Sequence, residues 1–448
     1  MDYSAIFSIF NFAIPTLIIV ICAGVIAGQS KDERFAFTPI FWFLLASIVY
    51  FGFGPFIYIF GNRETVNYLQ RFNNIGEIDL FETNLLNIVG FLITILAYKV
   101  TPEYNFKFLK SKCLVSSNNI CFFIFVILFI AGTLVGYLHN CYKFNFGQIF
   151  NMFRELQYSI LFIGGFALSR EINLRNIFFY LTIILVTLTA LLSMSKFVFL
   201  QCLIAIILGF YLKFFDRRYI CIGFIGIILS FPILDRIKAN IGFNGISNIT
   251  NCANEQPQQP KPIEQPQQPS FTHIFLNMKN SLRWGDGHTV NFAWARVVLV
   301  PNQAYVMSLY KDGYVNGSLR QALWMGVPRI LYPSKPVIHP MRDITYGERN
   351  LILNSGYYAE GFWNYGWSGV IFVSIIFGIY LKIGSLIARS LIENRIYVYY
   401  PIIFILIISA HRVEDWFTSN VLNSIFKIVY IMCVVYIVNY FYERFRQL

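Results

Sequence analysis

The chain has 448 residues, of which 56% are hydrophobic, 18% aromatic and only 13% charged, and its formal net charge is +12. An average soluble domain is roughly 25% charged, so this composition excludes a soluble globular protein. The lysines and arginines stand between hydrophobic segments and form no dense basic run interleaved with aromatic residues, which argues against nucleic acid as a partner.

Apolar segments long enough to span a bilayer recur along the chain. A hydrocarbon core about 30 Å thick is crossed by roughly 20 helical residues. The first segment has no basic n-region and no small-residue cleavage site, which favours a permanent helix over a signal peptide. We therefore predict an all-α, polytopic transmembrane bundle of about eleven spans. They centre on residues 5–27, 37–60, 83–98, 119–138, 156–169, 176–194, 197–213, 218–234, 366–388, 396–411 and 418–442.

The short connections between these segments differ in charge. Those on one side carry about sixteen Lys and Arg residues, Lys31 and Arg389 among them, and those on the other side about six. The positive-inside rule places the first set in the cytoplasm, with the N-terminus outside and the C-terminus inside. The one long connection, 235–361, then lies on the extracytoplasmic face, between an N-terminal bundle at 1–234 and C-terminal helices at 362–448.

The long connection divides into a spacer and more ordered parts. EQPQQP occurs twice within residues 255–270, and such proline-rich sequence favours extended polyproline II chain. Residues 271–284 and 291–310 carry apolar residues at helical spacing, which predicts short helices lying on or dipping into the membrane surface. For 291–310 the alternative is a transmembrane helix, with Arg296 in hydrocarbon. The four prolines of 326–348 predict an ordered surface turn.

Cationic side chains gather on or near the predicted outer face. Arginine binds phosphate through two parallel hydrogen bonds, so an amphiphile with a diphosphate at headgroup depth would meet several suitable donors. The alternative is that these cations bind membrane lipid headgroups or snorkel to the interface. The set consists of Arg283, Arg296, Arg320, Arg329, Lys335, Arg342, Arg349 and Arg412, with Lys196 at the tip of a tight outer hairpin.

Lys196 and Arg412 are the most informative members of this set. Each interrupts an apolar hairpin, where a charge is costly unless it serves a cavity or a partner. Glu414 and Asp415 follow Arg412 closely, so a local ion pair is the alternative explanation for that arginine. His411 is expected to be an interfacial partner of the same acids.

Few carboxylates on the predicted outer side could act as a general base. They are Asp286, Asp343, Glu348 and Glu360. Glu360 begins a span among aromatic residues, where partial desolvation would make its carboxylate a stronger base near neutral pH. The rings around it suit a membrane-interface belt, a surface on which sugars stack, or both. These rings belong to Tyr357, Tyr358, Trp363, Tyr365 and Trp367.

Motifs for cofactors and metals are missing from the sequence. No phosphate-binding glycine loop, dinucleotide fingerprint, HExxH pair or paired CxxC occurs, and no acidic pair in an outer loop suits a divalent cation. We therefore expect neither a cofactor nor a metal. Of the cysteines, only Cys141 and Cys252 are predicted to face outward, and their spacing does not favour a disulfide.

The C-terminal half resembles a known family. The matching features are Arg296 with Pro301 five residues on, VPRILYPSKP at 327–336, EGFWNYGWSG at 360–369, and the R-x-E-D pattern from Arg412 to Asp415. In this order they are similar to the Wzy-type polymerases of O-antigen and related repeat-unit polysaccharides, which include the enterobacterial common antigen polymerase. The hydropathy layout across residues 175–440 also fits, with SMSK at 193–196 where the family often has a hairpin of small residues and a cation.

The resemblance implies an activity and a location. Such enzymes are GT-C-like integral-membrane glycosyltransferases that act without metal on the periplasmic side of the bacterial cytoplasmic membrane. They transfer a growing glycan, such as that of lipopolysaccharide, from undecaprenyl diphosphate to a lipid-linked repeat unit. Their expected partners are a flippase and a chain-length regulator. The spaced Arg-to-Gly pattern of some members is not found in this outer loop, so the sugar and the linkage stay open.

The resemblance also implies site residues. Carried over position by position, the diphosphate-binding residues are Arg296, Arg329, Arg412 and Lys196. Lys335 and Arg342 of the same cationic set are further candidates. Glu360, followed by Glu348, is the base that we expect to take the acceptor proton.

Two other functions stay open at this stage. A ligase of the same architecture would move finished polymer onto lipid A core or protein. A transporter would usually show two similar halves and charged residues in mid-span. The sequence shows no such internal repeat, and its one long connection lies off-centre.

Overall fold

The computed structural model describes residues 3–60, 77–104, 130, 162, 177, 180–182, 184–185, 196–214, 218, 297–324, 332, 355–396 and 399–446. Every regular element among these residues is helical, so the all-α prediction is confirmed for this part of the chain. The α-helices are α1 (Tyr3–Gln29), α2 (Pro39–Ser47), α3 (Gly54–Phe60), α5 (Glu77–Val100), α9 (Lys196–Phe214), α13 (Val300–Lys311), α14 (Ser318–Gln321), α15 (Tyr357–Glu393), α16 (Tyr400–His411) and α17 (Asn423–Arg446). Short 3₁₀ turns form η1 (Phe35–Phe37) and η5 (Ala322–Trp324), and π-helical turns form η2 (Ile48–Phe53) and η7 (Thr418–Leu422).

Five stretches of helix in the described residues are long and apolar enough to cross a membrane. They are Ile9–Gln29, Pro39–Ile59, Leu80–Val100, Tyr357–Glu393 and Thr418–Ile437, and each overlaps a predicted span. The predicted spans at 197–213 and 396–411 contain shorter apolar helices, Gln201–Leu212 and Tyr400–His411. These helices make the chain a membrane protein. The other predicted spans, the Gln/Pro spacer and most of the long connection fall outside the described residues, so the total number of spans stays a prediction.

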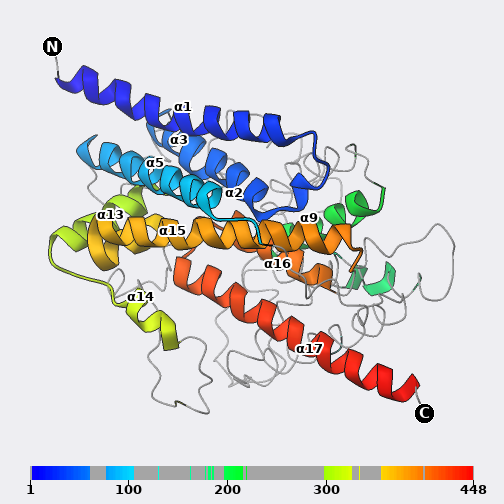
Figure 1. The fold of residues 1–448 in the computed structure, drawn as a ribbon. Coiled ribbons are helices and arrows are strands. Elements are labelled where there is room, and N and C mark those ends of the chain that lie inside the picture. The colour runs from blue at the N-terminus through cyan, green and yellow to red at the C-terminus, as the bar shows by residue number, and fades with distance from the viewer. Residues whose placement is uncertain are drawn as a thin grey trace, which may run out of the picture.

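Helix α15 is the centre of the bundle. Figure 1 shows α1, α5 and α15 lying side by side, with the N-terminus and the C-terminus of the chain at opposite ends. α5 and α15 approach closely because Gly378 has no side chain: a Cβ there would lie 2.5 Å from the carbonyl oxygen of Thr94. The ring of Tyr358 packs directly on Gly90, where an added Cβ would lie 2.5 Å from the ring. Small residues allow such close helix packing in membranes, where burial of apolar surface alone does not drive association.

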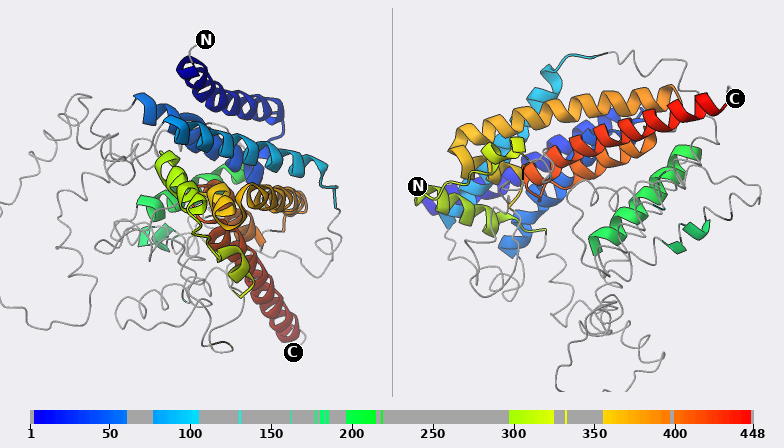
Figure 2. Two further views of the ribbon diagram at one scale, coloured as in Figure 1. Left: turned by 90° about the vertical axis from the view of Figure 1, so that its left-hand side faces the viewer. Right: turned by 90° about the horizontal axis from the view of Figure 1, so that it is seen from below.

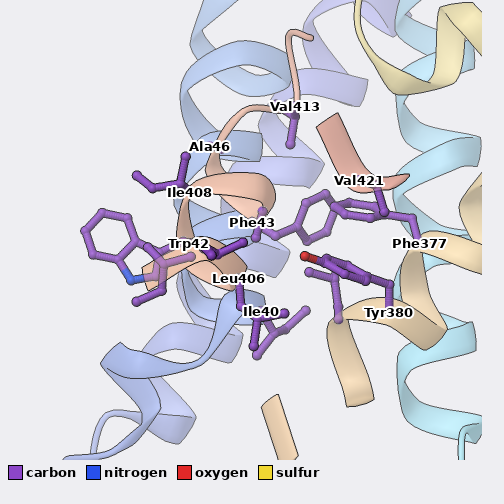
Figure 3. Close-up of a cluster of buried hydrophobic side chains, with 14 of the residues drawn as sticks. Ile40, Trp42, Phe43, Ala46, Phe377, Tyr380, Leu406, Ile408, Val413 and Val421 are labelled. Atoms are coloured by element: carbon purple, nitrogen blue, oxygen red, sulfur yellow. The ribbon is translucent and has the colours of Figure 1, made fainter. Parts of the chain in front are cut away.

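Aromatic and aliphatic side chains of α2, α15, α16 and η7 pack together in the core (Figure 3). Phe43 meets Phe377 edge to face, with ring centroids 5.2 Å apart. The hydroxyl of Tyr380 lies 2.5 Å from Ser409 Oγ and 2.9 Å from Ser424 Oγ. These buried hydroxyls join α15 to α16 and α17, so the core combines ring packing with satisfied polar groups.

Ion pairs join helix ends at both ends of the bundle. Where α1 and α5 finish, the pairs are Arg34–Glu393 at 2.5 Å, Arg389–Asp32 at 3.3 Å and Lys382–Glu103 at 3.1 Å. We call this the cationic end, because its arginines and lysine belong to the set predicted to face the cytoplasm. At the opposite end, Lys311 of α13 pairs with Glu82 of α5 at 2.5 Å. The side of the membrane that each end faces stays a prediction.

Helix α15 contains a sharp reversal near its start. Helical geometry breaks at Tyr365 and Gly366, and Gly366 adopts φ of 59° and ψ of −144°, which a residue with a side chain rarely adopts. The two limbs touch through glycine backbone, because a Cβ on Gly369 would overlap the carbonyl oxygen of Gly361. The run EGFWNYGWSG therefore encodes a tight helical hairpin rather than the start of one straight span.

The short limb of this hairpin runs back into the bundle. We call this limb, residues 357–364, the arm; its first turns stand apart from the long limb in the right-hand view of Figure 2. The ring of Tyr357 lies 4.9 Å from that of Phe377, and the Tyr358 hydroxyl lies 3.0 Å from Thr94 Oγ1. The arm thus begins beside the middle of the long limb and ends at the reversal.

The arm changes the interpretation of the surrounding aromatic residues. Tyr357, Tyr358 and Trp363 are at most 1% exposed, so they belong to the core. Tyr365 and Trp367, at the reversal, are 50% and 39% exposed. An interface belt therefore fits only the two residues at the turn.

Helix α13 is also packed into the bundle. Asn87 of α5 and Gln303 exchange two amide hydrogen bonds of 3.0 and 2.9 Å, and both side chains are at most 1% exposed. The sequence predicted for 291–310 a helix on or dipping into the membrane surface. The buried amide pair holds this 12-residue helix against α5, and α13 also packs on α15, while its place relative to the membrane surface stays a prediction.

We predict that Gly369→Ala destabilises the hairpin, because its Cβ would overlap the Gly361 carbonyl oxygen. Overpacking of this kind costs about 1–3 kcal/mol. The measurement is the melting temperature of the purified protein in detergent. Gly24→Ala in α1 is the matched control, since a Cβ there meets nothing within 4 Å. A G369A protein that melts like the wild type would contradict the hairpin.

Candidate functional site

A fully buried carboxylate lies on the arm. Glu360 is 0% exposed. Its Oε1 accepts hydrogen bonds from Ser318 Oγ at 2.7 Å and Thr418 Oγ1 at 2.6 Å, and its Oε2 accepts one from the Thr418 backbone N–H at 3.1 Å. Three donors offset much of the cost of removing a carboxylate from water. The third donor belongs to the N-terminus of the next helix, where negative charge is favoured.

Asn364 extends these contacts by one turn. Its Nδ2 donates to Ser318 Oγ at 3.0 Å and to the Glu360 carbonyl at 2.8 Å, and its Oδ1 accepts from the Leu319 N–H at 3.1 Å. We call Glu360, Asn364, Ser318 and Thr418 the Glu360 network. It joins three segments that are far apart in the sequence: the start of α14, the arm, and the start of η7.

The chain between α16 and η7 lies against the base of the arm. We call residues 412–417 the Arg412 loop. α16 has only 12 residues, and its last carbonyl groups find partners outside the helix. The Tyr357 hydroxyl donates to the Ser409 carbonyl at 2.6 Å, and Asn420 Nδ2 donates to the carbonyls of Ser409 and Arg412 at 3.1 and 3.3 Å. The Tyr357 N–H donates to the Val413 carbonyl at 3.3 Å.

This arrangement places the Arg412 loop against the interior of the bundle, while its depth in the membrane stays a prediction. Tyr357, which contacts the loop, packs on the middle of the long limb of α15. Figure 1 shows α17 beginning part of the way along α15, away from the end where α1 and α5 begin. Because α16 ends after 12 residues, the loop that follows it lies inside the bundle rather than at its outer face.

Arg412 is held by an ion pair within its own loop. Its Nη2 lies 2.5 Å from Asp415 Oδ2, and the side chains are 31% and 8% exposed. The local ion pair considered from the sequence is therefore present, and Asp415 is its partner. The pair fixes one edge of the guanidinium while part of the group remains accessible.

Glu414 differs from Asp415 in its surroundings. Its side chain is half-buried, and its buried Oε2 has no hydrogen-bond partner among the described residues. Burial and, secondly, the negative charge of Asp415 raise the pKa of Glu414 to about 8, and the positive charge of Arg412 opposes this shift. The hydroxyl of Tyr50, from η2, lies against the same carboxyl group.

Several hydrogen-bond donors around the loop are also unused within the described part of the chain. The indole of Trp416 packs on that of Trp363 at 5.9 Å, and its Nε1 has no acceptor although the residue is 4% exposed. Ser355 is 0% exposed, and its Oγ is unpaired. Ser355 precedes Gly356, where an added Cβ would lie 2.9 Å from the Val413 carbonyl oxygen. Buried polar groups are normally paired, so two unpaired donors beside one loop are unusual and need an explanation.

Two π-helical turns adjoin this region. η2 carries Tyr50 to Glu414, and η7 begins with Thr418 directly after the Arg412 loop. Single π-helical turns inside α-helices are frequent at functional sites. We therefore take the Arg412 loop, with Tyr50, Ser355 and the arm, as the candidate site.

The structure brings together two of the residues predicted from the sequence. Arg412 begins the loop, and Glu360 binds Thr418 just after its end. Lys196 is the first residue of α9. The other predicted site residues, Arg296, Arg329, Lys335, Arg342 and Glu348, lie outside the described residues, so their roles stay predictions.

Sequence reasoning underrated two members of this site. Glu414 was visible as one of two consecutive carboxylates beside an arginine between apolar helices, which is a usable signal. Tyr50 gave no signal, because it is one tyrosine in an apolar aromatic segment. Only the packing of α2, which η2 continues, against α16 places it at the loop.

The site is described by its charges and hydrogen bonds. Within the described ranges, His, Cys, Asp and Glu side chains do not gather in threes around a common point. Comparisons of the chain with protein families, curated proteins and solved structures gave no match.

We predict that Glu360→Gln destabilises the protein by about 1–3 kcal/mol, because a glutamine amide turns donor groups toward hydroxyl and N–H donors. Thermal unfolding in detergent measures the effect. Glu393→Gln is the control, since Glu393 pairs with Arg34 at an exposed site where an ion pair contributes at most about 1 kcal/mol. Equal melting of the two variants would show that the Glu360 network adds no stability.

We further predict that Glu414→Gln stabilises the protein at pH 8 but not at pH 4.5. The pKa of Glu414 is raised from 4.5 to about 8, so the folded state binds this proton more tightly than the unfolded state. The wild type therefore loses stability as the pH rises between these values, and the glutamine variant does not share this loss. Melting curves of both proteins across this range give the difference, and a pH-independent difference would contradict the assignment.

Proposed function

We propose that this chain is a repeat-unit polysaccharide polymerase of the bacterial cytoplasmic membrane. It transfers a growing glycan from undecaprenyl diphosphate to a lipid-linked repeat unit on the extracytoplasmic side. The observation that carries the proposal is Arg412, a partly accessible guanidinium held by buried Asp415 within an apolar bundle. The resemblance of the C-terminal half to Wzy-type polymerases supports the same class.

The surroundings of Arg412 suit a diphosphate carried on a lipid. Charged residues inside membrane helix bundles mark substrate paths, because their desolvation is otherwise unrewarded. A guanidinium matches phosphate oxygens through two parallel hydrogen bonds, and Asp415 orients it by occupying Nη2. The isoprenoid chain of such a substrate would remain in hydrocarbon while its diphosphate reaches the loop.

The same geometry serves glycosyl transfer. When the bond between the anomeric carbon and the diphosphate oxygen breaks, negative charge grows on the leaving diphosphate. A guanidinium fixed in advance stabilises this charge most strongly in the transition state. The arginine thus supplies the positive charge that a divalent cation supplies in other transferases.

One observation favours transport as a second candidate. The arm and η7 both begin inside the bundle, beside Tyr357 and Thr418. Interrupted helices of this kind build the binding sites of many transporters. The two functions differ in product, because a polymerase changes glycan length and a transporter does not.

We predict that Arg412→Gln abolishes polymer formation. The gene is deleted from the source cells and replaced by each variant, and the ladder of glycan lengths is read on a gel. Loss of the guanidinium should remove the ladder and leave single lipid-linked repeat units. Arg412→Lys should retain a minor part of the activity, because lysine keeps the charge but not the paired hydrogen bonds.

The controls separate binding from folding. Arg34→Gln at the cationic end changes an exposed arginine outside the candidate site and should leave the ladder intact. The double variant R412Q/D415N removes both members of the ion pair, so that Asp415 is not left as an unpaired carboxylate that destabilises the loop. A normal ladder in R412Q would overturn the proposal. Full-length lipid-linked polymer in the deletion strain would show a ligase, and unchanged glycan length with a loss of export would show a transporter.

A further inference from the structure

Glycosyl transfer requires a group that takes the proton of the acceptor hydroxyl, and two carboxylates compete for this role. Glu360 was expected from the sequence. In the structure it is 0% exposed, and its oxygens accept three hydrogen bonds from Ser318 and Thr418. An acceptor hydroxyl would have to displace these donors. Glu360 is therefore placed to hold the arm and η7 together.

Glu414 has the properties that Glu360 lacks. Its side chain is half-buried rather than fully buried, and the Tyr50 hydroxyl lies against its carboxyl group. Its Oε2 is a buried atom that accepts no hydrogen bond in the described part of the chain. It lies two residues after Arg412, so a base and a diphosphate-binding group occur on one short loop. Asp415, the neighbouring carboxylate, is engaged by Arg412 at 2.5 Å.

On these grounds we infer that Glu414 is the general base of the proposed reaction. A lone pair of the acceptor hydroxyl oxygen forms the new bond to the anomeric carbon, and the hydroxyl proton passes to the Glu414 carboxylate. The bond from the anomeric carbon to the diphosphate oxygen breaks. Its electron pair leaves with undecaprenyl diphosphate, whose charge Arg412 stabilises.

The groups around Glu414 are consistent with this role. Tyr50 faces it from η2, Tyr357 lies near it from the arm, and Arg412, Asp415 and His411 belong to its own segment. Burial and the charge of Asp415 raise its pKa to about 8. A base works best when its pKa lies near the working pH.

The inference rests on the proposed function, so its test begins with binding and turnover by the wild type. The substrate is the lipid-linked saccharide extracted from cells that lack this gene, and the protein is the purified full chain in liposomes. Undecaprenyl diphosphate serves as the binding probe, and its binding is measured by the change in the tryptophan fluorescence of the protein. Single-turnover extension of the saccharide measures the chemical step.

We expect Glu414→Gln to slow extension by about 10²–10⁴-fold, the usual contribution of a general base. Its affinity for undecaprenyl diphosphate should change less than about threefold, because the diphosphate contacts remain. The wild-type rate should rise with pH through about 8, since only the ionised carboxylate accepts a proton. Sodium formate should partly restore Glu414→Ala, which a merely structural role would not allow.

Two comparisons make the outcome decisive. Glu393→Gln at the cationic end should keep wild-type extension. If E414Q extends the saccharide at more than a tenth of the wild-type rate, or if E360Q binds the probe normally and loses extension while E414Q keeps it, the inference is overturned. If the wild type neither binds undecaprenyl diphosphate nor extends the saccharide, the proposed function fails, and the inference fails with it.

Discussion

The hydrogen bonds accepted by Glu360 hold together segments that lie far apart in the sequence. Ser318 lies 42 residues before Glu360, and Thr418 lies 58 residues after it. A buried carboxylate without donors would cost several kcal/mol, so each of these segments is needed to keep Glu360 where it is. The dependence is mutual, because Glu360 also accepts the N–H that begins η7. The position of the Arg412 loop, which lies between α16 and η7, follows from this contact.

A non-helical loop inside an apolar bundle is tolerated only when its backbone groups are paired. The Arg412 loop meets this condition through neighbours on the arm and η7. Tyr357 binds the carbonyls of Ser409 and Val413, and Asn420 binds those of Ser409 and Arg412. The arm is therefore more than a cover for the core. It supplies the hydrogen bonds that allow α16 to stop after 12 residues and to present charged side chains within the membrane protein.

The sequence predicted the elements that depend on local composition. Apolar stretches near 5–27, 37–60 and 83–98 became helices, since their hydrophobicity is a property of each segment by itself. The reversal at Tyr365 and Gly366 was not predicted, because aromatic residues and glycines beside a span are equally suited to a membrane interface. The hairpin depends on contact between Gly361 and Gly369, which no periodicity reveals.

The candidate site also has features that the sequence predicts and features that it does not. Arg412 could be singled out from the sequence, because a charge between apolar helices demands a reason. Its place against the interior of the bundle could not, since that depends on where α16 ends and what pairs with its last carbonyls. The buried pair of Asn87 and Gln303 was equally hidden, because two amides 216 residues apart carry no sign of their partnership. The sequence therefore predicts helix formation but does not predict long-range polar pairing.

Three carboxylates near the arm illustrate how surroundings divide roles among chemically similar groups. Glu360 accepts three hydrogen bonds and connects elements, and Asp415 accepts an ion pair and orients Arg412. The Oε2 of Glu414 has neither a hydrogen-bond donor nor an ion-pair partner among the described residues. Hydrogen-bond donors oppose the effect of burial at Glu360, and a cation does so at Asp415, whereas the negative charge of Asp415 adds to the effect of burial at Glu414. Proton transfer is therefore the role that we propose for Glu414, and the other two carboxylates hold its loop and its cation in place.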